Sequence, residues 1–398
     1  MKTNIKTDAF AYSSKVEVVR LNNGKPIISP TSNWWEDGVT YNPTALFLER
    51  SPQNDPIIKK LLDINSLDDP RIKDGVVIVH YRARSSKERD TKRPFSRSFS
   101  GLAIYTPELK LIHRHKTPAI LPEDDENHYD YVGIEDGRLH CFGDTYYYLY
   151  CGVGLSPNPR PNWPLKAQIC LAKSKDLLKW EKLGPIRGNV NTKENNNKDG
   201  VFFPDKINGY YFMLHRPCFD TNYSKHAIAL AMSRSIEGTW EDLGILEYAP
   251  QNPEIAKHVW AGAGAVPMAL GNKRYLVIYH RGHVLKSGEK WYDLHAAIFN
   301  FNKFTPAHPH KIIEKQLERL LIPETPHEKC AANWNDGVAN VIFTCGCYEY
   351  GGDLYILYGG ADCCTLAARV NKKTLLDALE NAERNNEQRR IGDTGCRR

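Results

Sequence analysis

The sequence predicts an all-β protein that is built from repeated strand units. Short runs rich in β-branched and aromatic residues follow one another along most of the chain. Gly, Pro, Asn and Asp separate these runs, and few segments carry a long 3.6-residue period. The chain contains 21 Tyr, 13 Phe and 8 Trp, and such side chains suit strands and sugar-binding clefts alike. Because the runs recur at similar spacing, they indicate a repeat architecture.

Five runs share one design, in which a polar turn precedes a strongly apolar strand that ends in polar residues. The runs are DGVVIVHYRAR (74–84), DTYYYLYCGVG (144–154), NGYYFMLHRP (208–217), NKRYLVIYHRG (272–282) and GGDLYILYGGAD (351–362). Their cores lie roughly 65 to 80 residues apart, and a second strand rich in small residues follows each. Four-stranded blades around an axis fit this spacing, so we expect a five-bladed β-propeller. A two-domain β-sandwich protein is the alternative, and it explains the even spacing less well.

The propeller is expected to occupy residues 1–376 as a single domain. The stretch that follows, LDALENAERNNEQRRIGDTGCRR, is charged and helix-prone before it loses its apolar residues. We therefore expect residues 377–398 to form a short surface helix and a frayed tail.

The charge and hydropathy of the sequence argue against nucleic-acid and membrane partners. The formal net charge is +6 over 398 residues, and no compact Lys/Arg patch indicates a nucleic-acid partner. The N-terminus lacks the apolar core of a signal sequence, and no run approaches the roughly 18 apolar residues of a membrane helix. We expect a cytoplasmic protein without a membrane partner, whose ten cysteines are reduced thiols. No cysteine pair has zinc-site spacing, so no metal site is predicted.

The propeller prediction brings polar residues from distant segments together. If the five runs are the inner strands, the polar residues at their ends meet at one mouth of a central channel. These residues are Arg82, Arg84, His215, Arg216, Tyr279, His280 and Asp362.

Six motifs, in order along the chain, carry a resemblance to a known family. They are YNPTALF (41–47), YRAR (81–84), GIEDGR (133–138), NKDGVFFPDKINGYYFMLHRP (197–217), GAGAVP (262–267) with the following IYH (278–280), and YGGAD (358–362). Together they resemble glycoside hydrolase family 130, the β-mannoside phosphorylases and β-mannosidases. The resemblance covers most of the chain and implies a five-bladed catalytic propeller.

The resemblance assigns Asp136 as the proton donor, acting through a hydroxyl of the bound mannose. An external nucleophile then attacks the opposite face and inverts the anomeric centre. In phosphorylases that nucleophile is phosphate, whereas hydrolases need a second carboxylate to activate water. A donor acid works best with its pKa raised towards neutrality. Glu135 could supply a like charge, but alternation along a strand predicts that both acids do not enter the pocket. Arg138 is the expected partner of Asp136.

The resemblance also distributes the binding roles. The predicted substrate-binding residues are Asn42, Arg82, Glu135, Arg138, His215, Trp260 and Asp362. The predicted phosphate-binding residues are Lys198, Arg216, Tyr279 and His280. Phosphate needs several converging cations. Each of these residues could instead be an ordinary polar residue at the end of a strand. His215 could be a histidine packed in the core.

One departure from the family pattern bears on the nucleophile. Many phosphorylases place a Lys two residues before the GAG turn, where this chain has Trp260. Lys257 or His258 could replace that cation. Otherwise Trp260 is a sugar-stacking platform, and Glu254 is the nearest candidate for a second carboxylate.

These observations predict an inverting phosphorylase that cleaves β-mannosides with inorganic phosphate to give α-mannose 1-phosphate. The alternative is an inverting β-mannosidase, and a non-catalytic sugar- or protein-binding propeller is the third possibility. We expect no cofactor beyond phosphate as co-substrate. The expected partner is a small β-mannoside oligosaccharide, and a homo-oligomer is left open.

Overall fold

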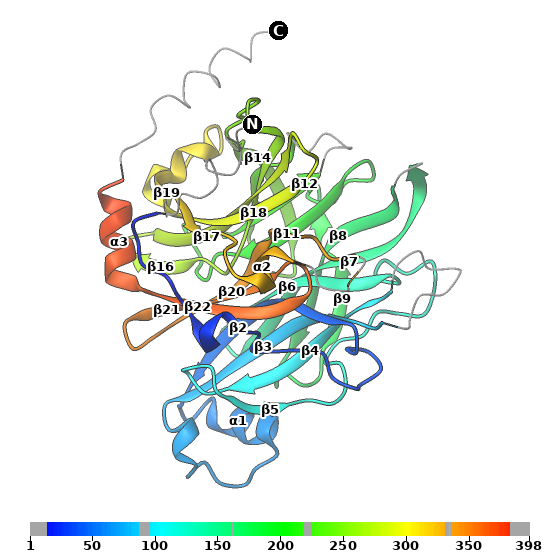
Figure 1. Cartoon of the computed structure of the whole chain (residues 1–398), viewed down its shortest axis with the longest axis vertical. Helices are drawn as coiled ribbons and strands as arrows, with labels where there is room; N and C mark the ends of the chain where they lie inside the picture. The colour runs from blue at the N-terminus through cyan, green and yellow to red at the C-terminus, as the bar shows by residue number, and fades with distance from the viewer. Residues whose placement is uncertain are drawn as a thin grey trace, which may run out of the picture.

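The computed structural model describes residues 14–86, 96–160, 163–218, 225–330, 334 and 336–382 of the chain. Strands dominate it, and only a few short helices lie at its edges (Figure 1). The predicted all-β class is therefore confirmed. Within the described residues no helix is long and apolar enough to cross a membrane.

The largest sheet joins two of the expected repeat units. Its order is β2-β3-β4-β6-β7-β8-β9, with β5 paired to β4. Its strands are β2 (Val39–Glu49), β3 (Gly75–Arg84), β4 (Ser98–Tyr105), β5 (Leu111–Arg114), β6 (Gly133–Phe142), β7 (Thr145–Arg160), β8 (Trp163–Ser174) and β9 (Glu181–Pro185). The two halves meet at a single parallel pairing, Ser98 with Gly133, whereas every other pairing in the sheet is antiparallel.

Three further sheets complete the strands that the structure describes. Their orders are β10-β14-β13-β12-β11, β15-β17-β18-β19 with β16 on β17, and β1-β22-β21-β20. The first contains β10 (Arg187–Gly188), β11 (Asn196–Phe202), β12 (Tyr211–Cys218), β13 (Ile228–Ser233) and β14 (Thr239–Glu247). The second contains β15 (Ala256–Ala263), β16 (Met268–Gly271), β17 (Arg274–Leu285), β18 (Lys290–Asn300) and β19 (Ile313–Leu321). The third contains β1 (Val19–Arg20), β20 (Ile342–Tyr350), β21 (Asp353–Gly360) and β22 (Cys364–Asn371).

The five apolar runs form β3, β7, β12, β17 and β21. They contact neighbouring units, as β21 contacts β2 and β3 contacts β6. The equivalent strands that contact one another from unit to unit are those before the runs: β2 contacts β6 and β20, β6 contacts β11 and β20, and β11 contacts β15. The prediction that the runs are the inner strands is therefore wrong. The runs read as strongly apolar because a mid-sheet strand such as β3 is covered on both faces.

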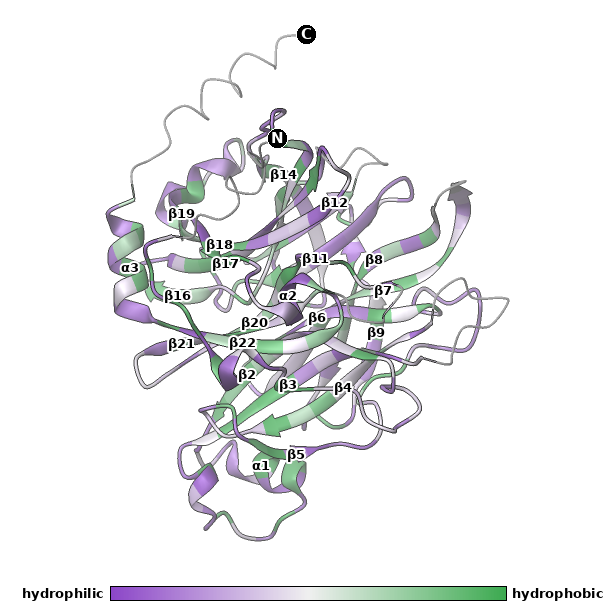
Figure 2. Ribbon diagram, viewed as in Figure 1, coloured by the Kyte–Doolittle hydropathy of each residue, from purple (hydrophilic) through white to green (hydrophobic). Residues whose placement is uncertain are grey.

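The hydrophobic core is divided into clusters that lie between neighbouring units. Ile78 and Ile104 pack with Tyr148 in one cluster, and a second cluster joins Val77 to Leu357 of β21. Thus alternate residues of β3 serve opposite faces. Apolar colouring runs along the strands, and many connecting loops are polar (Figure 2).

Three of the inter-unit strands carry a β-bulge at an equivalent place. Register shifts lie between Tyr41 and Thr44, between Glu135 and Arg138, and between Lys198 and Val201. Inside the bulges Asn42, Asp136 and Asp199 have φ values of 48°, 49° and 56°. Positive φ is uncommon outside glycine, although Asn and Asp tolerate it best. The three bulges thus place an Asn or Asp in the same unusual backbone conformation at equivalent places of neighbouring units.

The helices are α1 (Asp55–Leu62), α2 (Pro326–Lys329) and α3 (Lys372–Glu380). Helix α3 crosses the predicted boundary between residues 376 and 377 and buries Leu375 and Leu379 in a core cluster. The helix thus belongs to the packed body, and α3 lies at its edge (Figure 1). The predicted frayed tail lies mostly outside the described residues, and the single-domain assignment stays a prediction.

Candidate active site

The candidate site is centred on Asp136, which is 6% exposed in the bulge of β6. Asn42, from the equivalent bulge of β2, donates from Nδ2 to Asp136 Oδ1 at 2.8 Å. Arg82 of β3 approaches the same oxygen from Nη1 at 3.4 Å, and its Nε donates to Ser98 Oγ at 2.9 Å. The structure thus brings together three predicted residues that lie far apart in the sequence.

Glu135 shares the site with Asp136, although strand alternation predicted that both acids do not enter it. The guanidinium of Arg82 bonds Glu135 through Nη2 while Nη1 faces Asp136. The prediction is wrong because the bulge interrupts the alternation of side chains at this point. A single arginine therefore faces two carboxylates.

The pKa values of Asp136 and Asp362 are shifted in opposite directions. Burial favours the neutral form of Asp136, but Arg82, Lys198 and the Asn42 hydrogen bond outweigh it and hold its pKa at about 2. The protein's own charges therefore lower the pKa of Asp136 and do not give the expected rise towards neutrality. Burial dominates at Asp362, whose pKa rises to about 6 although Arg82 opposes the shift.

Two predicted phosphate-binding residues lie beside these acids. Lys198 and Arg216 are register partners on β11 and β12. Lys198 Nζ lies 3.0 Å from Glu135 Oε2, and Arg216 Nε lies 2.7 Å from Asp199 Oδ2. Burial alone would lower the pKa of Lys198, but Glu135 raises it well above its usual value, so both cations are charged at neutral pH.

Asp199 is a site residue that the sequence analysis missed. Its carboxylate is 1% exposed and touches Arg216 and His280, two of the predicted phosphate-binding residues. A signal was present in the sequence, because KDG (198–200) repeats the pattern EDG (135–137). Both stretches place an aspartate in a bulge before a glycine.

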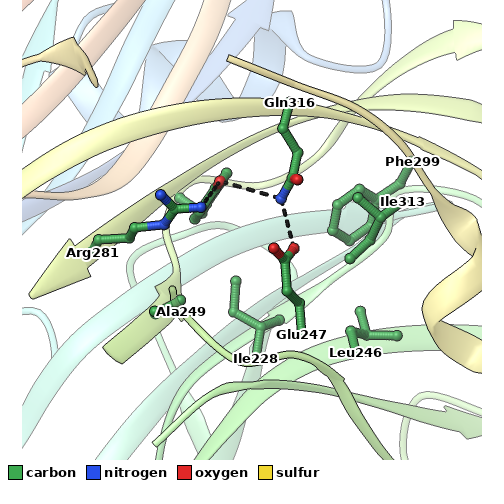
Figure 3. Close-up of a pocket in the computed structure, with 10 residues that line it drawn as sticks. Ile228, Leu246, Glu247, Ala249, Arg281, Phe299, Ile313 and Gln316 are labelled. Atoms are coloured by element: carbon green, nitrogen blue, oxygen red, sulfur yellow. Dashed lines mark hydrogen bonds between the residues drawn. The ribbon is translucent and has the colours of Figure 1, made fainter. Parts of the chain in front are cut away.

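His280 and Tyr279 lie on opposite faces of β17, so only one of them belongs to the site. His280 Nε2 lies 3.5 Å from Asp199 Oδ2, and burial lowers the pKa of this imidazole to about 3, which keeps it neutral. Tyr279 instead lines a small cavity. Glu247, Arg281 and Gln316 line the same cavity (Figure 3). The phosphate-binding prediction for Tyr279 is wrong, because neighbouring strand residues alternate in direction.

Arg138 contacts main-chain atoms and not the carboxylate of Asp136. It is fully buried and donates to the carbonyl oxygens of Asp136 at 2.9 Å, Ala263 at 2.8 Å and Gly264 at 3.0 Å. The predicted substrate contact is therefore replaced by a structural role. Arg138 fixes the bulge of β6 against the chain that follows β15.

His215 is a packed core histidine, which was the structural alternative for this residue. It is wholly buried, its Nδ1 lies 3.0 Å from Asn197 Nδ2, and its Nε2 lies 3.3 Å from Asp242 Oδ1. Its neighbour Arg216 takes the opposite face of β12 and reaches the site. The substrate-binding prediction for His215 is wrong for the same geometric reason as that for Tyr279.

Trp260 is 1% exposed and cannot act as an open sugar platform. Its ring lies edge-to-face on Tyr292 at 5.3 Å and occupies the space above Gly282, where a Cβ would meet it at 2.2 Å. Glu254, the predicted second carboxylate, lies in an exposed turn before β15. Tyr292 was not predicted, and its half-buried ring lies 5.9 Å from that of His280.

The arrangement can hold an anion beside a carboxylic acid. Arg82, Lys198 and Arg216 supply three cations, and Asp136 lies within reach of their charges. Among the described residues no group of three His, Cys, Asp or Glu side chains is placed to hold a metal ion, so no residue is assigned to one. Proton transfer from a buried acid, with a tetrahedral anion on the cationic side, is the chemistry this geometry supports.

Comparison with known families supports an assignment to carbohydrate chemistry. A family model described as beta-1,4-mannooligosaccharide phosphorylase matches residues 71–381. The match covers most of the chain and includes every predicted site residue except Asn42.

Two relatives from Thermoanaerobacter sp. (strain X514) align with much of the chain. A 1,2-beta-oligomannan phosphorylase is 32% identical over 230 residues, which are 58% of this chain and 65% of that protein. A beta-1,2-mannobiose phosphorylase is 26% identical over 351 residues, or 87% of this chain and 94% of that protein. The chain thus spans just under two thirds of the first relative.

A solved structure shares the fold. A glycosyl hydrolase from Bacteroides ovatus superposes with a TM-score of 0.61 at 20% identity, covering 91% of this chain and 95% of that one. At this identity the likeness concerns the fold alone.

Proposed function

The chain belongs to glycoside hydrolase family 130, and on that premise we propose that it is an inverting β-mannoside phosphorylase. It cleaves a β-mannoside with inorganic phosphate and releases α-mannose 1-phosphate. The relatives named as phosphorylases of β-1,2-linked mannosides favour that linkage.

The single observation that carries the proposal is the pair of cations beside Asp136, the buried Arg216 and Lys198, whose side chain is 26% exposed. Lys198 and Arg216 face each other across β11 and β12, and both lie within electrostatic reach of Asp136. One lysine in water holds phosphate weakly, whereas two cations that converge on one partly enclosed place bind it well.

In this mechanism Asp136 gives the proton that the leaving oxygen needs, relayed through a mannose hydroxyl. Asn42 and Arg82 hold its carboxyl group in place. Its pKa of about 2 depends on the charges of Arg82 and Lys198. A bound phosphate dianion offsets those positive charges, so its arrival raises the pKa of Asp136 and prepares the acid for catalysis.

The test is to incubate the protein with short β-1,2- and β-1,4-mannosides with and without phosphate. We expect cleavage that requires phosphate, with α-mannose 1-phosphate identified by ³¹P NMR and by its anomeric proton signal. Equal rates of free mannose release in both conditions would overturn the phosphorylase assignment.

An inverting β-mannosidase is the second candidate. It is favoured by Trp260 in the place of a family lysine, and by Asp199, a buried second carboxylate that could activate water. Hydrolysis in H₂¹⁸O would place the label on the anomeric oxygen of mannose, while phosphorolysis would place none there.

The arrangement of the sheets supports a five-bladed β-propeller. If the largest sheet is divided at its one parallel pairing, the strands fall into five units, which are antiparallel apart from the short pairing of β10 with β14. A core cluster joins the first unit to the last, through Val77 and Leu357, as ring closure requires. An experimental structure with fivefold pseudosymmetry would bear this out, and an open arrangement of sheets would contradict it.

Inorganic phosphate is the only non-protein group in the proposed reaction, apart from the sugar. We expect activity to persist after dialysis against EDTA, and a loss that Mg²⁺ or Zn²⁺ restores would contradict this. The cytoplasmic location stays a prediction.

A further inference from the structure

A buried carboxylate at the centre of an anion site needs an explanation. Asp199 is 1% exposed, and its left-handed backbone, with φ of 56°, fixes it in the bulge of β11. Its Oδ2 lies over Gly262 of β15, where a Cβ would come within 2.2 Å. The fold therefore leaves room for this carboxylate by placing a glycine opposite it.

Neither oxygen of Asp199 makes a hydrogen bond among the described residues, and only Oδ2 has an ion-pair contact there. Oδ2 lies 2.7 Å from Arg216 Nε and 3.5 Å from His280 Nε2. Oδ1 has no hydrogen-bond partner among the residues that the structure describes. A buried carboxylate oxygen without a donor costs free energy, so this oxygen is placed to receive a donor from a ligand.

Arg216 is held in a way that suits a tetrahedral anion. Asp199 meets its Nε, and the two terminal nitrogens have no partner within the described part of the chain. Those nitrogens form the fork that binds an oxyanion through two parallel hydrogen bonds. His280 adds a neutral ring with both nitrogens unpaired among the described residues.

The ligand must therefore satisfy cations and a carboxylate at the same time. A fully ionised anion such as sulfate offers only acceptors, so Asp199 Oδ1 would repel it. Hydrogen phosphate carries a P–OH group that can donate to that oxygen while its other oxygens accept from Arg216 and Lys198. Charge and hydrogen-bond type together select the protonated anion.

We propose that Asp199 is a specificity-determining residue that accepts a hydrogen bond from the P–OH of hydrogen phosphate and excludes sulfate. The inference rests on the proposed phosphorylase function and names the ionic form of its co-substrate. Arsenate, which also carries a proton near neutral pH, should be accepted. During attack the proton stays on the oxygen that faces Asp199, and a different phosphate oxygen forms the bond to the anomeric carbon.

The first test uses the wild-type protein and isothermal titration with phosphate, arsenate and sulfate at pH 7 and fixed ionic strength. A buried charge left without a donor predicts sulfate binding about 10- to 100-fold weaker than phosphate binding. Sulfate affinity within about threefold of phosphate would overturn the proposal, whatever the variants do.

The second test is Asp199→Asn, with Asp205→Asn as the matched control in the exposed loop after β11. The amide can donate to sulfate, so discrimination should fall to about threefold or less, and KM for phosphate should rise about tenfold or more. Asp205→Asn should keep the wild-type discrimination. If Asp199→Asn still rejects sulfate, the inference fails.

The two proposals fail in different ways. Phosphate-independent cleavage overturns the phosphorylase assignment, and it is read from the reaction products. Loss of anion discrimination is read from binding alone. Thermal melting of Asp199→Asn shows whether it folds, and the wild-type titration decides the question if it does not.

Discussion

At the scale of single residues, the site depends on carboxyl groups whose protonation is set by their surroundings. Asp136 faces Arg82 and accepts from Asn42, and its pKa is about 2. Burial is the largest influence on the pKa of Asp362, which it raises to about 6. The same site therefore contains one acid that is ionised at all working pH values until phosphate binds, and one that titrates just below neutrality.

Replacing Asp136 by Asn should remove the proton donor without removing the sugar site. We expect kcat to fall by about 10²- to 10⁴-fold, while Kd for a β-mannoside by titration changes little. Asp144→Asn, at the exposed turn that follows β6, is the control and should keep full activity. If Asp136→Asn retains near wild-type kcat, the proton-donor role is wrong.

Asp362 predicts a pH dependence of substrate binding. Its pKa is raised from 3.8 to about 6, so the carboxylate that would accept sugar hydroxyls is present above pH 6 and lost below it. KM for the mannoside should rise about tenfold as pH falls from 7 to 5. Asp362→Asn should give a higher KM that is flat across this range. A KM for this variant that still follows the wild-type curve would assign the titration to another group.

At the scale of elements, the bulges decide which side chains enter the site. Between Glu135 and Arg138 the bulge turns two successive acids towards Arg82. On β17 no shift occurs near Tyr279 and His280, and ordinary alternation sends them to opposite faces. A strand thus follows the alternation rule except where its pairing contains an extra residue.

Gly137 lies in the bulge because a neighbouring ring fills the place of a side chain. A Cβ on Gly137 would lie 2.0 Å from Tyr148 Cζ. Gly137→Ala should lower the free energy of unfolding by about 1 to 3 kcal/mol through overpacking, measured by urea denaturation. In a Tyr148→Ala background the same substitution should cost much less. An equal cost in both backgrounds would point to backbone strain instead.

At the scale of the whole molecule, the N-terminal segment completes the last sheet. Strand β1 pairs with β22, as Val19 with Arg369 and Arg20 with Ala368, and Figure 1 shows this segment beside the C-terminal strands. Arg20 Nε donates at 2.8 Å to the wholly buried Glu328, which also accepts from Tyr358 Oη at 2.8 Å. Strand β1 is therefore tied to α2 and β21 through one buried carboxylate.

Removing Arg20 should destabilise the protein far more than removing Arg369, the register partner of Val19 on β22. Arg20→Ala leaves Glu328 buried without its counter-charge and should cost about 3 to 5 kcal/mol of unfolding free energy. Arg369→Ala breaks only an exposed pair with Asp353 and should cost less than about 1 kcal/mol. If Arg20→Ala and Arg369→Ala lower the free energy of unfolding equally in thermal and urea melts, the Arg20–Glu328 pair does not stabilise the protein.

Some of the fold and site could be predicted from sequence because the signals are local. Alternating apolar runs between turn residues specify strands, and their recurrence specifies repeated units. The family motifs placed Asp136, Asn42, Arg82, Lys198 and Arg216 in one site, and the structure brings them together.

The tertiary structure alone decided which residues of each motif face the site. Register shifts arise from the pairing of two strands, so a bulge cannot be recognised from one strand's pattern. That is why Glu135 entered the site and Asp199 was missed, while Tyr279 and His215 were assigned to it wrongly. Burial likewise depends on neighbouring strands, since the ring of Trp260 packs against Tyr292 and Gly282.

The sequence by itself determined the strands, their repeat and the chemical groups available, because these follow from local propensity and composition. Only the packing of strand on strand determined direction, burial and pKa, because these depend on residues far apart in the chain.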